Sequence, residues 1–307
     1  MTTIDDMHHI SDTPSLRYTF GIRIFYFLLI TFVGLIVALL VMSVALKGGM
    51  TTMSLRLGTV AQDIFLFILP AIVTAMMVSM LPARMLCIDR MPSLRLTMTG
   101  LLAWICSIPA MNALVAWNEG LTLPAGLAPV EEWMRQAEEA ARGQVEILIS
   151  GTSVGALIVN ILIVGVLAGV SEELYFRGAL QRLISSGGRV NHHVAIWVTA
   201  VLFSAFHMQF FGFFPRLVLG AFFGYLLWWS GSIWLPALIH AINNSLVVCA
   251  TWRHNVALAA GEGDAGVDPS AWGADSVVAV ILSVVLTAVA VWLLKNTTLF
   301  RNGVTRE

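Results

Sequence analysis

The sequence predicts an all-α, polytopic integral membrane protein with about eight transmembrane helices. Apolar residues make up 58% of the 307 residues and charged residues only 11%, whereas roughly a quarter of the residues in a soluble domain are charged. Apolar runs recur along the chain, and many reach the length of about 20 helical residues that crosses a hydrocarbon core of about 30 Å. These observations indicate one membrane domain over residues 1–307.

Eight runs have this length and composition. In chain order they cover residues 24–46, 64–81, 96–117, 151–170, 194–210, 213–229, 233–252 and 277–294. The first run follows a polar stretch, MTTIDDMHHISDTPSLRYTF, which lacks a basic region and a small-residue cleavage site. We therefore expect the first helix to be retained as an anchor and not removed as a signal peptide.

Two segments between the runs are polar. The segment from Pro129, PVEEWMRQAEEAARGQVEIL, places Val130, Trp133 and Ala137 on one helical face and mostly Glu and Arg on the other. This pattern predicts a short helix that lies at the membrane interface. Residues 255–275 are rich in Gly, Ala and Asp and are expected to form a flexible loop. Neither segment has the pattern of a separate domain.

Charge and cysteine content limit the partners of the chain. The net charge of -1 gives no indication of a nucleic-acid partner. If the N-terminus is cytoplasmic, eleven of the 17 Lys and Arg residues lie on the cytoplasmic side, so the positive-inside rule places both termini of a multi-pass cell-membrane protein in the cytoplasm. Cys87, Cys106 and Cys249 lack metal-ligand spacing and are expected to be buried thiols.

Polar side chains inside the apolar runs are the candidates for chemistry. The stretch SEELYFRGAL, residues 171–180, directly follows an uncharged run and contains two adjacent glutamates and an arginine. An ionisable group at mid-membrane costs roughly 3 kcal/mol on insertion scales, so it needs a partner, a water-filled cavity or a function. The residues that stand out are Glu172, Glu173, His207, His240 and Asn244.

Helix geometry indicates that these residues meet. If the chain reverses at SSGGRVN, Glu172 and His207 are almost equidistant from the turn. Equal rises of about 1.5 Å per residue then put them at the same height on an antiparallel helix pair. His240 and Asn244 are four residues apart and share one helical face.

The two glutamates are expected to differ in their partners. Glu173 and Arg177 are four residues apart and can neutralise each other, whereas Glu172 points about 100° away and is left free. A free glutamate beside a histidine in a partly dry site can act as a general base for water. A histidine and an asparagine on a facing helix can donate hydrogen bonds to an oxyanion. This combination is typical of a peptidase without a nucleophilic serine.

At these residues the sequence resembles the CPBP family of CAAX proteases and bacteriocin-processing enzymes, whose members are intramembrane endopeptidases. Its motifs EExxxR, FxxxH and HxxxN occur here in that order, as Glu172, Glu173 and Arg177, as FSAFH ending at His207, and as His240 with Asn244. The resemblance covers about residues 150–250, which are the expected catalytic core.

The resemblance implies a division of roles. Glu172 and His207 would activate water, His240 with Asn244 would stabilise the oxyanion, and the other two residues of the first motif would support the site. The substrate would be a membrane-associated peptide or protein, and prenylation of that substrate is not assumed. No cofactor is expected. A zinc ion held by Glu172, His207 and His240 is the less favoured alternative.

Other functions stay open at this point. A non-catalytic membrane scaffold or bacteriocin-immunity protein of the same fold would tolerate loss of Glu172. A transporter would use the buried charges as a proton relay, although no inverted repeat is visible. GTSVG at residues 151–155 matches a serine-nucleophile pattern without its strand, turn and helix. GEGD at residues 261–264 is similar to a motif of intramembrane aspartyl proteases but lies in the polar loop.

Overall fold

The computed structural model describes residues 16–187, 190–261 and 276–304, with side chains up to residue 296. These residues are almost entirely helical and contain no β-strand, which confirms the all-α fold class. Seven helices within the described ranges are long and apolar enough to cross a membrane. Helices suit lipid because they satisfy their own backbone hydrogen bonds.

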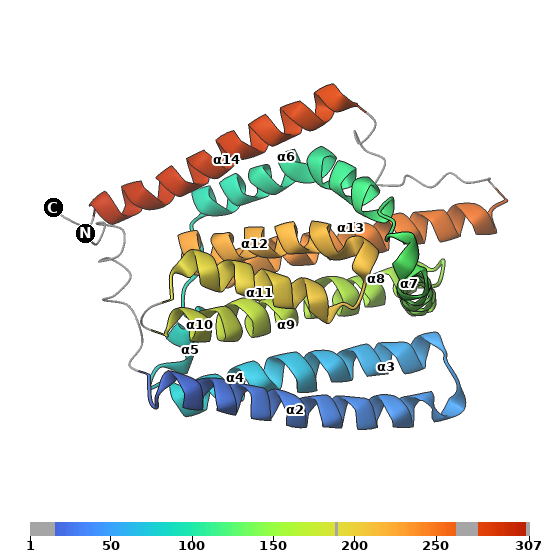
Figure 1. Ribbon diagram of the computed structural model, residues 1–307, viewed down its shortest axis with the longest axis horizontal. Helices are drawn as coiled ribbons and strands as arrows, with labels where there is room; N and C mark the ends of the chain where they lie inside the picture. Colours follow the sequence, from blue (N-terminus) through green and yellow to red (C-terminus); the bar gives the residue numbers. More distant parts are fainter. Residues whose placement is uncertain (1–15, 188–189, 262–275, 305–307) are drawn as a thin grey trace.

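Figure 1 shows the elements that build these long helices. They are α2 (Phe20–Ala45) with η1 (Leu46–Gly48); α3 (Thr52–Gln62), η2 (Asp63–Ile68) and α4 (Leu69–Val78); α6 (Leu94–Glu119); α8 (Val154–Asn160), η4 (Ile161–Leu167), α9 (Ala168–Glu173), η5 (Leu174–Gln181) and α10 (Arg182–Ser185); η6 (Phe210–Gly212) with α12 (Phe213–Ser230); α13 (Trp234–Ala259); and α14 (Val277–Val304). The remaining elements are α5 (Pro82–Met85), η3 (Ala125–Leu127), α7 (Ala128–Leu148) and α11 (His192–Phe206).

Two differences from the predicted spans bear on the site. The helix expected over residues 194–210 is α11, which has 15 residues and ends at Phe206. At about 1.5 Å per residue it is about 22 Å long, less than the full hydrocarbon core. Met208 then adopts a left-handed conformation (φ 52°), which a helix does not continue through. The helix expected from residue 64 begins at Thr52, so Asp63 lies inside it.

The helices form three groups (Figure 1). α2, α3 and α4 make one outer group, α6 and α14 pair along the opposite side, and α9 to α13 lie between them. The start of α2 and the end of α14 lie at the same end of the molecule. This arrangement suits a chain whose two described ends share one side of the membrane.

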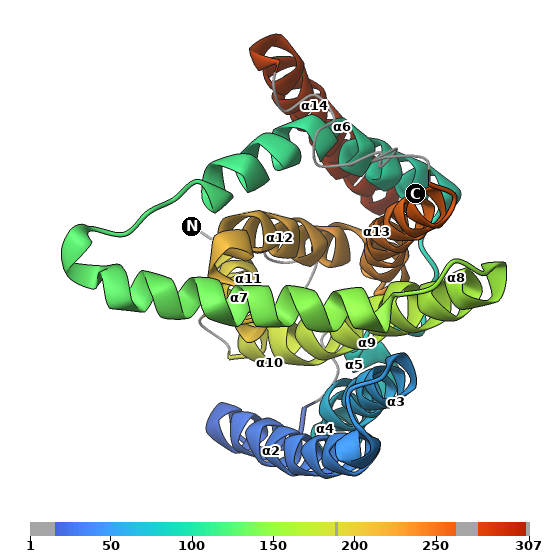
Figure 2. The same cartoon turned by 90° about the vertical axis from the view of Figure 1, so that its right-hand side faces the viewer.

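The amphipathic helix α7 crosses the other end of the bundle. Figure 1 shows it end-on, and Figure 2 shows it running across the ends of the central helices. None of its 21 residues is buried, and Val130 and Trp133 are exposed. The helix that the sequence predicts is therefore present. Its position at a membrane interface stays a prediction, and its crosswise direction favours it.

Two glycines allow the central helices to approach each other closely. Gly165 and Gly169 face α13: a Cβ atom on Gly169 would lie 2.9 Å from the backbone nitrogen of Ala241, and one on Gly165 would overlap Ser245 Oγ. Small residues at such positions permit close contact between membrane helices. This contact holds α9 against the part of α13 that carries His240.

The smaller sequence expectations have mixed outcomes. Cys87 is a buried free thiol, whereas Cys106 and Cys249 are only half-buried, so the expectation of three buried thiols holds for one of them. Ser153 of the GTSVG stretch caps α8 by accepting a hydrogen bond from Ala156 N. The predicted loop over residues 255–275 begins later, because α13 continues to Ala259. Residues 262–275, which include most of GEGD, lie outside the described residues.

Candidate active site

The two adjacent glutamates lie near the middle of one long helix. Residues Val154–Ser185 are continuous, and the π-helical segments η4 and η5 flank α9 within them. Such π-helical turns are frequent at functional sites. Glu172 and Glu173 are the last two residues of α9, so η5, which carries Arg177, begins directly after them.

Glu173 is completely buried and has two partners at the same oxygen, Oε1. Arg177 Nη1 donates a hydrogen bond to this atom at 2.7 Å, and His240 Nδ1 lies 2.9 Å from it. Arg177 is also completely buried, and its Nη2 donates to the carbonyl oxygen of Gly220 at 2.9 Å. The pair of Glu173 and Arg177 agrees with the i, i+4 spacing. The bond to His240 joins two helices, and the spacing gave no sign of it.

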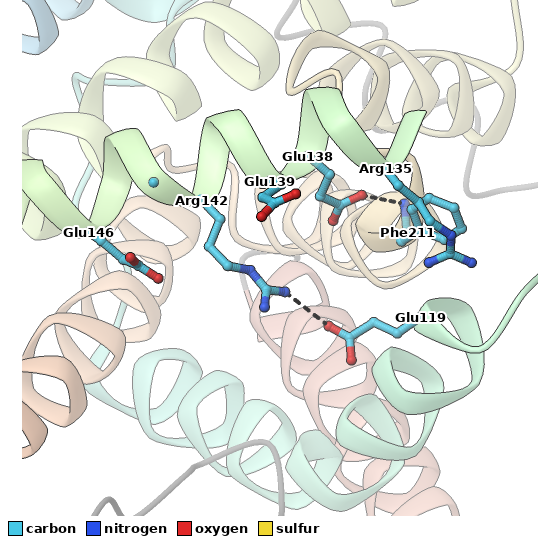
Figure 3. A pocket seen from close by; sticks show the side chains of 8 residues that line it. Glu119, Arg135, Glu138, Glu139, Arg142, Glu146 and Phe211 are labelled. Atoms are coloured by element: carbon cyan, nitrogen blue, oxygen red, sulfur yellow. Dashed lines mark hydrogen bonds and ion pairs between the residues drawn. The ribbon is translucent and has the colours of Figure 1, made fainter. Parts of the chain in front are cut away.

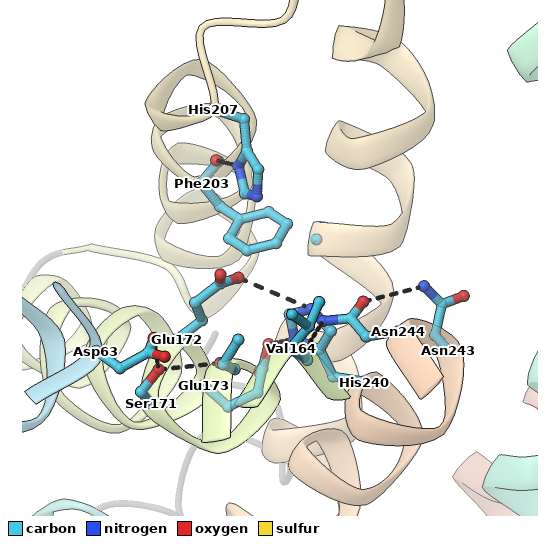
Figure 4. A network of polar contacts seen from close by, with 12 residues as sticks. Asp63, Val164, Ser171, Glu172, Glu173, Phe203, His207, His240, Asn243 and Asn244 are labelled. Atoms are coloured by element: carbon cyan, nitrogen blue, oxygen red, sulfur yellow. Dashed lines mark hydrogen bonds and ion pairs between the residues drawn. The ribbon is translucent and has the colours of Figure 1, made fainter. Parts of the chain in front are cut away.

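Contacts with two aromatic rings and with Glu173 fix the orientation of the His240 ring. Phe223 stacks against it with ring centroids 4.9 Å apart, and Phe203 meets it edge-on at 5.9 Å. A carboxylate only accepts hydrogen bonds. His240 Nδ1 therefore carries a hydrogen and donates a hydrogen bond to Glu173. Its Nε2 atom faces the other glutamate and lies 3.8 Å from Glu172 Oε2 (Figure 4).

Glu172 is the more accessible of the two glutamates, with 14% of its side chain exposed against 0% for Glu173. Its Oε2 atom has no hydrogen-bond partner among the described residues. The 3.8 Å between Glu172 Oε2 and His240 Nε2 is compatible with one water oxygen placed about 2.8 Å from both atoms. The geometry therefore allows a single water molecule to contact both side chains.

His207 directly follows α11 and is its C-cap residue. Its Nδ1 donates to the carbonyl oxygen of Phe203 at 2.9 Å, and in the neutral ring this bond leaves the lone pair on Nε2. His207 and Glu172 interact electrostatically, and Figure 4 shows the Glu172 carboxylate on the side of the site where Phe203 and His207 lie. Between these two described residues there is no direct hydrogen bond.

Asn244 lies one turn after His240 on α13. Its Nδ2 donates to the carbonyl oxygen of Val164 in η4 at 3.3 Å, and its Oδ1 lies 3.5 Å from Asn243 Nδ2. A primary amide carries two N–H groups. The contact with Val164 therefore leaves one of them for a further acceptor.

A buried aspartate that the sequence reasoning did not single out adjoins these residues. Asp63, in η2, is 1% exposed, and its Oδ1 lies 2.7 Å from the Oγ atom of Ser171, the residue before Glu172. Figure 4 shows Asp63 and Ser171 beside Glu172. An acidic residue next to an apolar run was the available signal, but starting that run at residue 64 placed Asp63 outside the membrane.

The segment after His207 is held by α6 and α7. Asn118, a buried residue near the end of α6, accepts a hydrogen bond from Phe214 N at 2.9 Å. From α7, Glu138 accepts one from Phe211 N at 3.0 Å. These two contacts fix the backbone of the segment that follows His207.

A cavity of about 530 Å³ lies beside this segment, between α7, the end of α6 and Phe211 (Figure 3). Four glutamates and two arginines line it, and Arg142 lies 3.8 Å from Glu119 across it. The six predicted site residues are all described, and none of them lines this cavity. The cavity therefore neighbours the candidate site without being part of it.

Glu172, His207 and His240 are the possible zinc ligands that the sequence analysis named. In the structure, the two histidines keep only their Nε2 atoms available. The Nδ1 atoms of His207 and His240 both have protein acceptors, so only their Nε2 atoms could face a metal. In the described ranges, no group of three or more His, Cys, Asp or Glu side chains is arranged to hold a metal ion.

Comparison with known proteins finds one family model that resembles the central segment. Residues 154–246 match the family model described as Type II CAAX prenyl endopeptidase Rce1-like. The matched segment contains all six predicted site residues and confirms the resemblance to the CPBP family. At the level of the family, this match supports a CAAX-type intramembrane protease. No curated protein and no solved structure matched the chain.

Proposed function

We propose that the protein is an intramembrane endopeptidase that hydrolyses a peptide bond of a membrane-associated substrate with water activated by Glu172 and His207. The observation that carries the proposal is the orientation of His240. Its Nδ1 is bound to Glu173, and its Nε2 faces the free oxygen of Glu172 at 3.8 Å. A free carboxylate and an oriented ring nitrogen thus converge within the segment that matches the protease family.

In this proposal Glu172 is the general base. Its Oε2 takes a proton from water while the water oxygen bonds to the carbonyl carbon of the substrate, and the electron pair of the carbonyl moves to its oxygen. The lone pair on His207 Nε2 accepts a hydrogen bond from the same water and orients it. When the carbon–nitrogen bond breaks, the proton held by Glu172 passes to the leaving nitrogen.

His240 and Asn244 then stabilise the oxyanion. The second N–H group of Asn244 is one donor. His240 Nε2 is a donor only when the ring is protonated, because Nδ1 already carries a proton. The Glu173 carboxylate stabilises that charged ring, and Arg177 in turn neutralises Glu173. The two supporting residues therefore act on the charge of His240.

We further propose a multi-pass protein of the cell membrane with both termini in the cytoplasm. The distribution of Lys and Arg supports this orientation, and the start of α2 and the end of α14 share one end of the bundle. No cofactor is proposed. The substrate is a membrane-associated peptide or protein.

The function is tested by comparing membrane peptides from cells that contain either the wild type or the Glu172→Ala variant at equal abundance. Mass spectrometry should detect cleavage products that disappear in the variant while the intact substrates accumulate. A scaffold or immunity protein would not depend on this carboxylate. Identical peptide sets from the two cell lines would therefore contradict the proposal.

A further inference from the structure

Asp63 is a buried acid for which the proposed reaction gives no role. It lies within the membrane-spanning helix Thr52–Val78 and is 1% exposed. Its Oδ1 contacts Ser171 Oγ at 2.7 Å, and that hydroxyl also lies 3.0 Å from the carbonyl oxygen of Ala168. In the part of the chain that the structure describes, Asp63 Oδ2 has no hydrogen-bond partner.

The number of hydrogens available for the two contacts of Ser171 Oγ indicates whether the Asp63 carboxyl group is protonated. Ser171 has a single hydroxyl hydrogen, and both an ionised Asp63 and the Ala168 carbonyl can only accept. One of the two short contacts would then lack a hydrogen. If Asp63 is protonated, it donates to Ser171, and Ser171 donates to Ala168, so both contacts are hydrogen bonds. Burial also disfavours a charged carboxylate that has an oxygen without a partner.

A neutral Asp63 has two consequences for Glu172. The two carboxyl groups interact electrostatically, and neighbouring carboxylates resist joint ionisation. A neutral Asp63 therefore adds no second negative charge beside Glu172, the proposed base. In addition, Ser171 precedes Glu172 on α9, so its bond to η2 fixes the rotation of α9 and the direction of the next side chain.

We propose that Asp63 is a positioning residue of the active site. It is a neutral acid that donates a hydrogen bond to Ser171 and so holds Glu172 in its orientation toward His240. This inference rests on the proposed role of Glu172 as the base. Asp63 lies outside residues 154–246, the segment matched by the family model, so the flanking helices contribute directly to the geometry of the site.

The test uses the purified full-length protein in lipid nanodiscs and a synthetic transmembrane reporter peptide that the wild type cleaves and Glu172→Ala does not. The variants are Asp63→Asn, Asp63→Leu, Ser171→Ala and the double variant of the last two. Ser283→Ala is the matched control, because Ser283 is 3% exposed and its Oγ donates to the Cys106 carbonyl at 2.6 Å, between α14 and α6.

Asparagine keeps a donor toward Ser171 and leucine does not. We expect Asp63→Asn to keep kcat within about threefold of the wild type and Asp63→Leu to lower it about 30-fold, with little change in KM. Leucine should not lower the thermal midpoint, because Asp63 Oδ2 has no partner to lose among the described residues and Ser171 keeps its hydrogen bond to Ala168. Ser171→Ala should resemble Asp63→Leu, and the double variant should be no worse than either. Ser283→Ala should keep wild-type kinetics.

Infrared spectroscopy gives a readout that does not depend on activity. The wild type at neutral pH should show the carbonyl band of a protonated carboxylic acid that is missing in Asp63→Asn. Absence of that band, or an Asp63→Asn variant as slow as Asp63→Leu, would overturn the neutral-acid assignment.

Two further outcomes separate the possible errors. Full activity of both Asp63→Leu and Ser171→Ala, or a loss that only follows the folded fraction, would overturn the positioning role and leave the proposed function intact. Cleavage of the reporter by Glu172→Gln at the wild-type rate would instead overturn the proposed role of Glu172 as the base, on which this inference rests.

Discussion

Glu173 and His240 are joined by a hydrogen bond of 2.9 Å between residues that lie 67 positions apart on different helices. The same carboxylate oxygen accepts a hydrogen bond from Arg177 at 2.7 Å. Glu173 therefore connects a buried guanidinium to the ring that faces Glu172. Breaking either of these two hydrogen bonds of Glu173 should affect both the stability of the helix bundle and the charge of His240.

Arg177→Ala should lower both protein abundance and activity. The change leaves Glu173 as a buried charge without its cation, and breaking a buried pair in this way costs about 3–5 kcal/mol. Immunoblotting and the thermal unfolding midpoint measure the effect. Arg142→Ala is the control, because Arg142 is exposed and its contact with Glu119 is 3.8 Å long, so the unfolding free energy should change by less than about 1 kcal/mol. Arg177→Ala protein that is active at normal levels would contradict the structural role of the pair.

Asn244→Ala should lower kcat by about 100-fold or more and change KM little. An oxyanion donor acts on the transition state and not on the bound substrate. Asn243→Ala removes the same side chain from the neighbouring position and should change kcat by only a few fold. A variant of Asn244 with a raised KM and a normal kcat would assign this residue to substrate binding.

A chelator should leave the wild-type enzyme active, because the proposed mechanism uses no metal. Elemental analysis of the purified protein, together with a chelator titration, checks this expectation. About one tightly bound zinc per chain, whose removal stops cleavage and whose return restores it, would overturn the metal-free mechanism. In that case His207→Ala and His240→Ala should both lose the metal.

Gly169→Ala should destabilise the protein and slow cleavage. Its added Cβ would lie 2.9 Å from the backbone nitrogen and 3.0 Å from the Cα of Ala241, and a neighbouring backbone cannot move aside as a side chain can. We expect a loss of about 1–3 kcal/mol in unfolding free energy and a separation of α9 from α13. Gly143→Ala in α7, where a Cβ has no neighbour within 4 Å, should be neutral or stabilising by up to about 1 kcal/mol. Equal unfolding midpoints for the two variants would argue against this contact.

The fold class followed from hydropathy, because lipid selects long apolar helices whatever their tertiary contacts. The boundaries did not follow so closely. α11 stops at Phe206 because the backbone turns at Met208, and no proline or glycine between these positions marks the turn in the sequence. The second long helix begins at Thr52 and includes Arg56 and Asp63, two charged residues that lowered the local hydropathy and hid its first three turns.

Sequence spacing predicted only those contacts of the site that lie within one helix. The spacing of Glu173 and Arg177 specifies a pair within one helix, and the structure contains that pair. The bond from Glu173 to His240 and the contact of Asp63 with Ser171 depend on how separate helices pack. One pattern could have signalled that packing: GVLAG, residues 165–169, places two glycines on the face that meets α13.

The most direct test of the central claim is the cleavage rate of the reporter peptide by purified Glu172→Gln protein, measured beside its thermal unfolding midpoint. Glutamine keeps the size of the side chain and removes the base. We expect an unchanged midpoint and a cleavage rate lowered by about 100-fold to 10,000-fold, which is the usual contribution of a general base. A folded Glu172→Gln enzyme that cleaves the peptide at the wild-type rate would contradict the claim that Glu172 activates the attacking water.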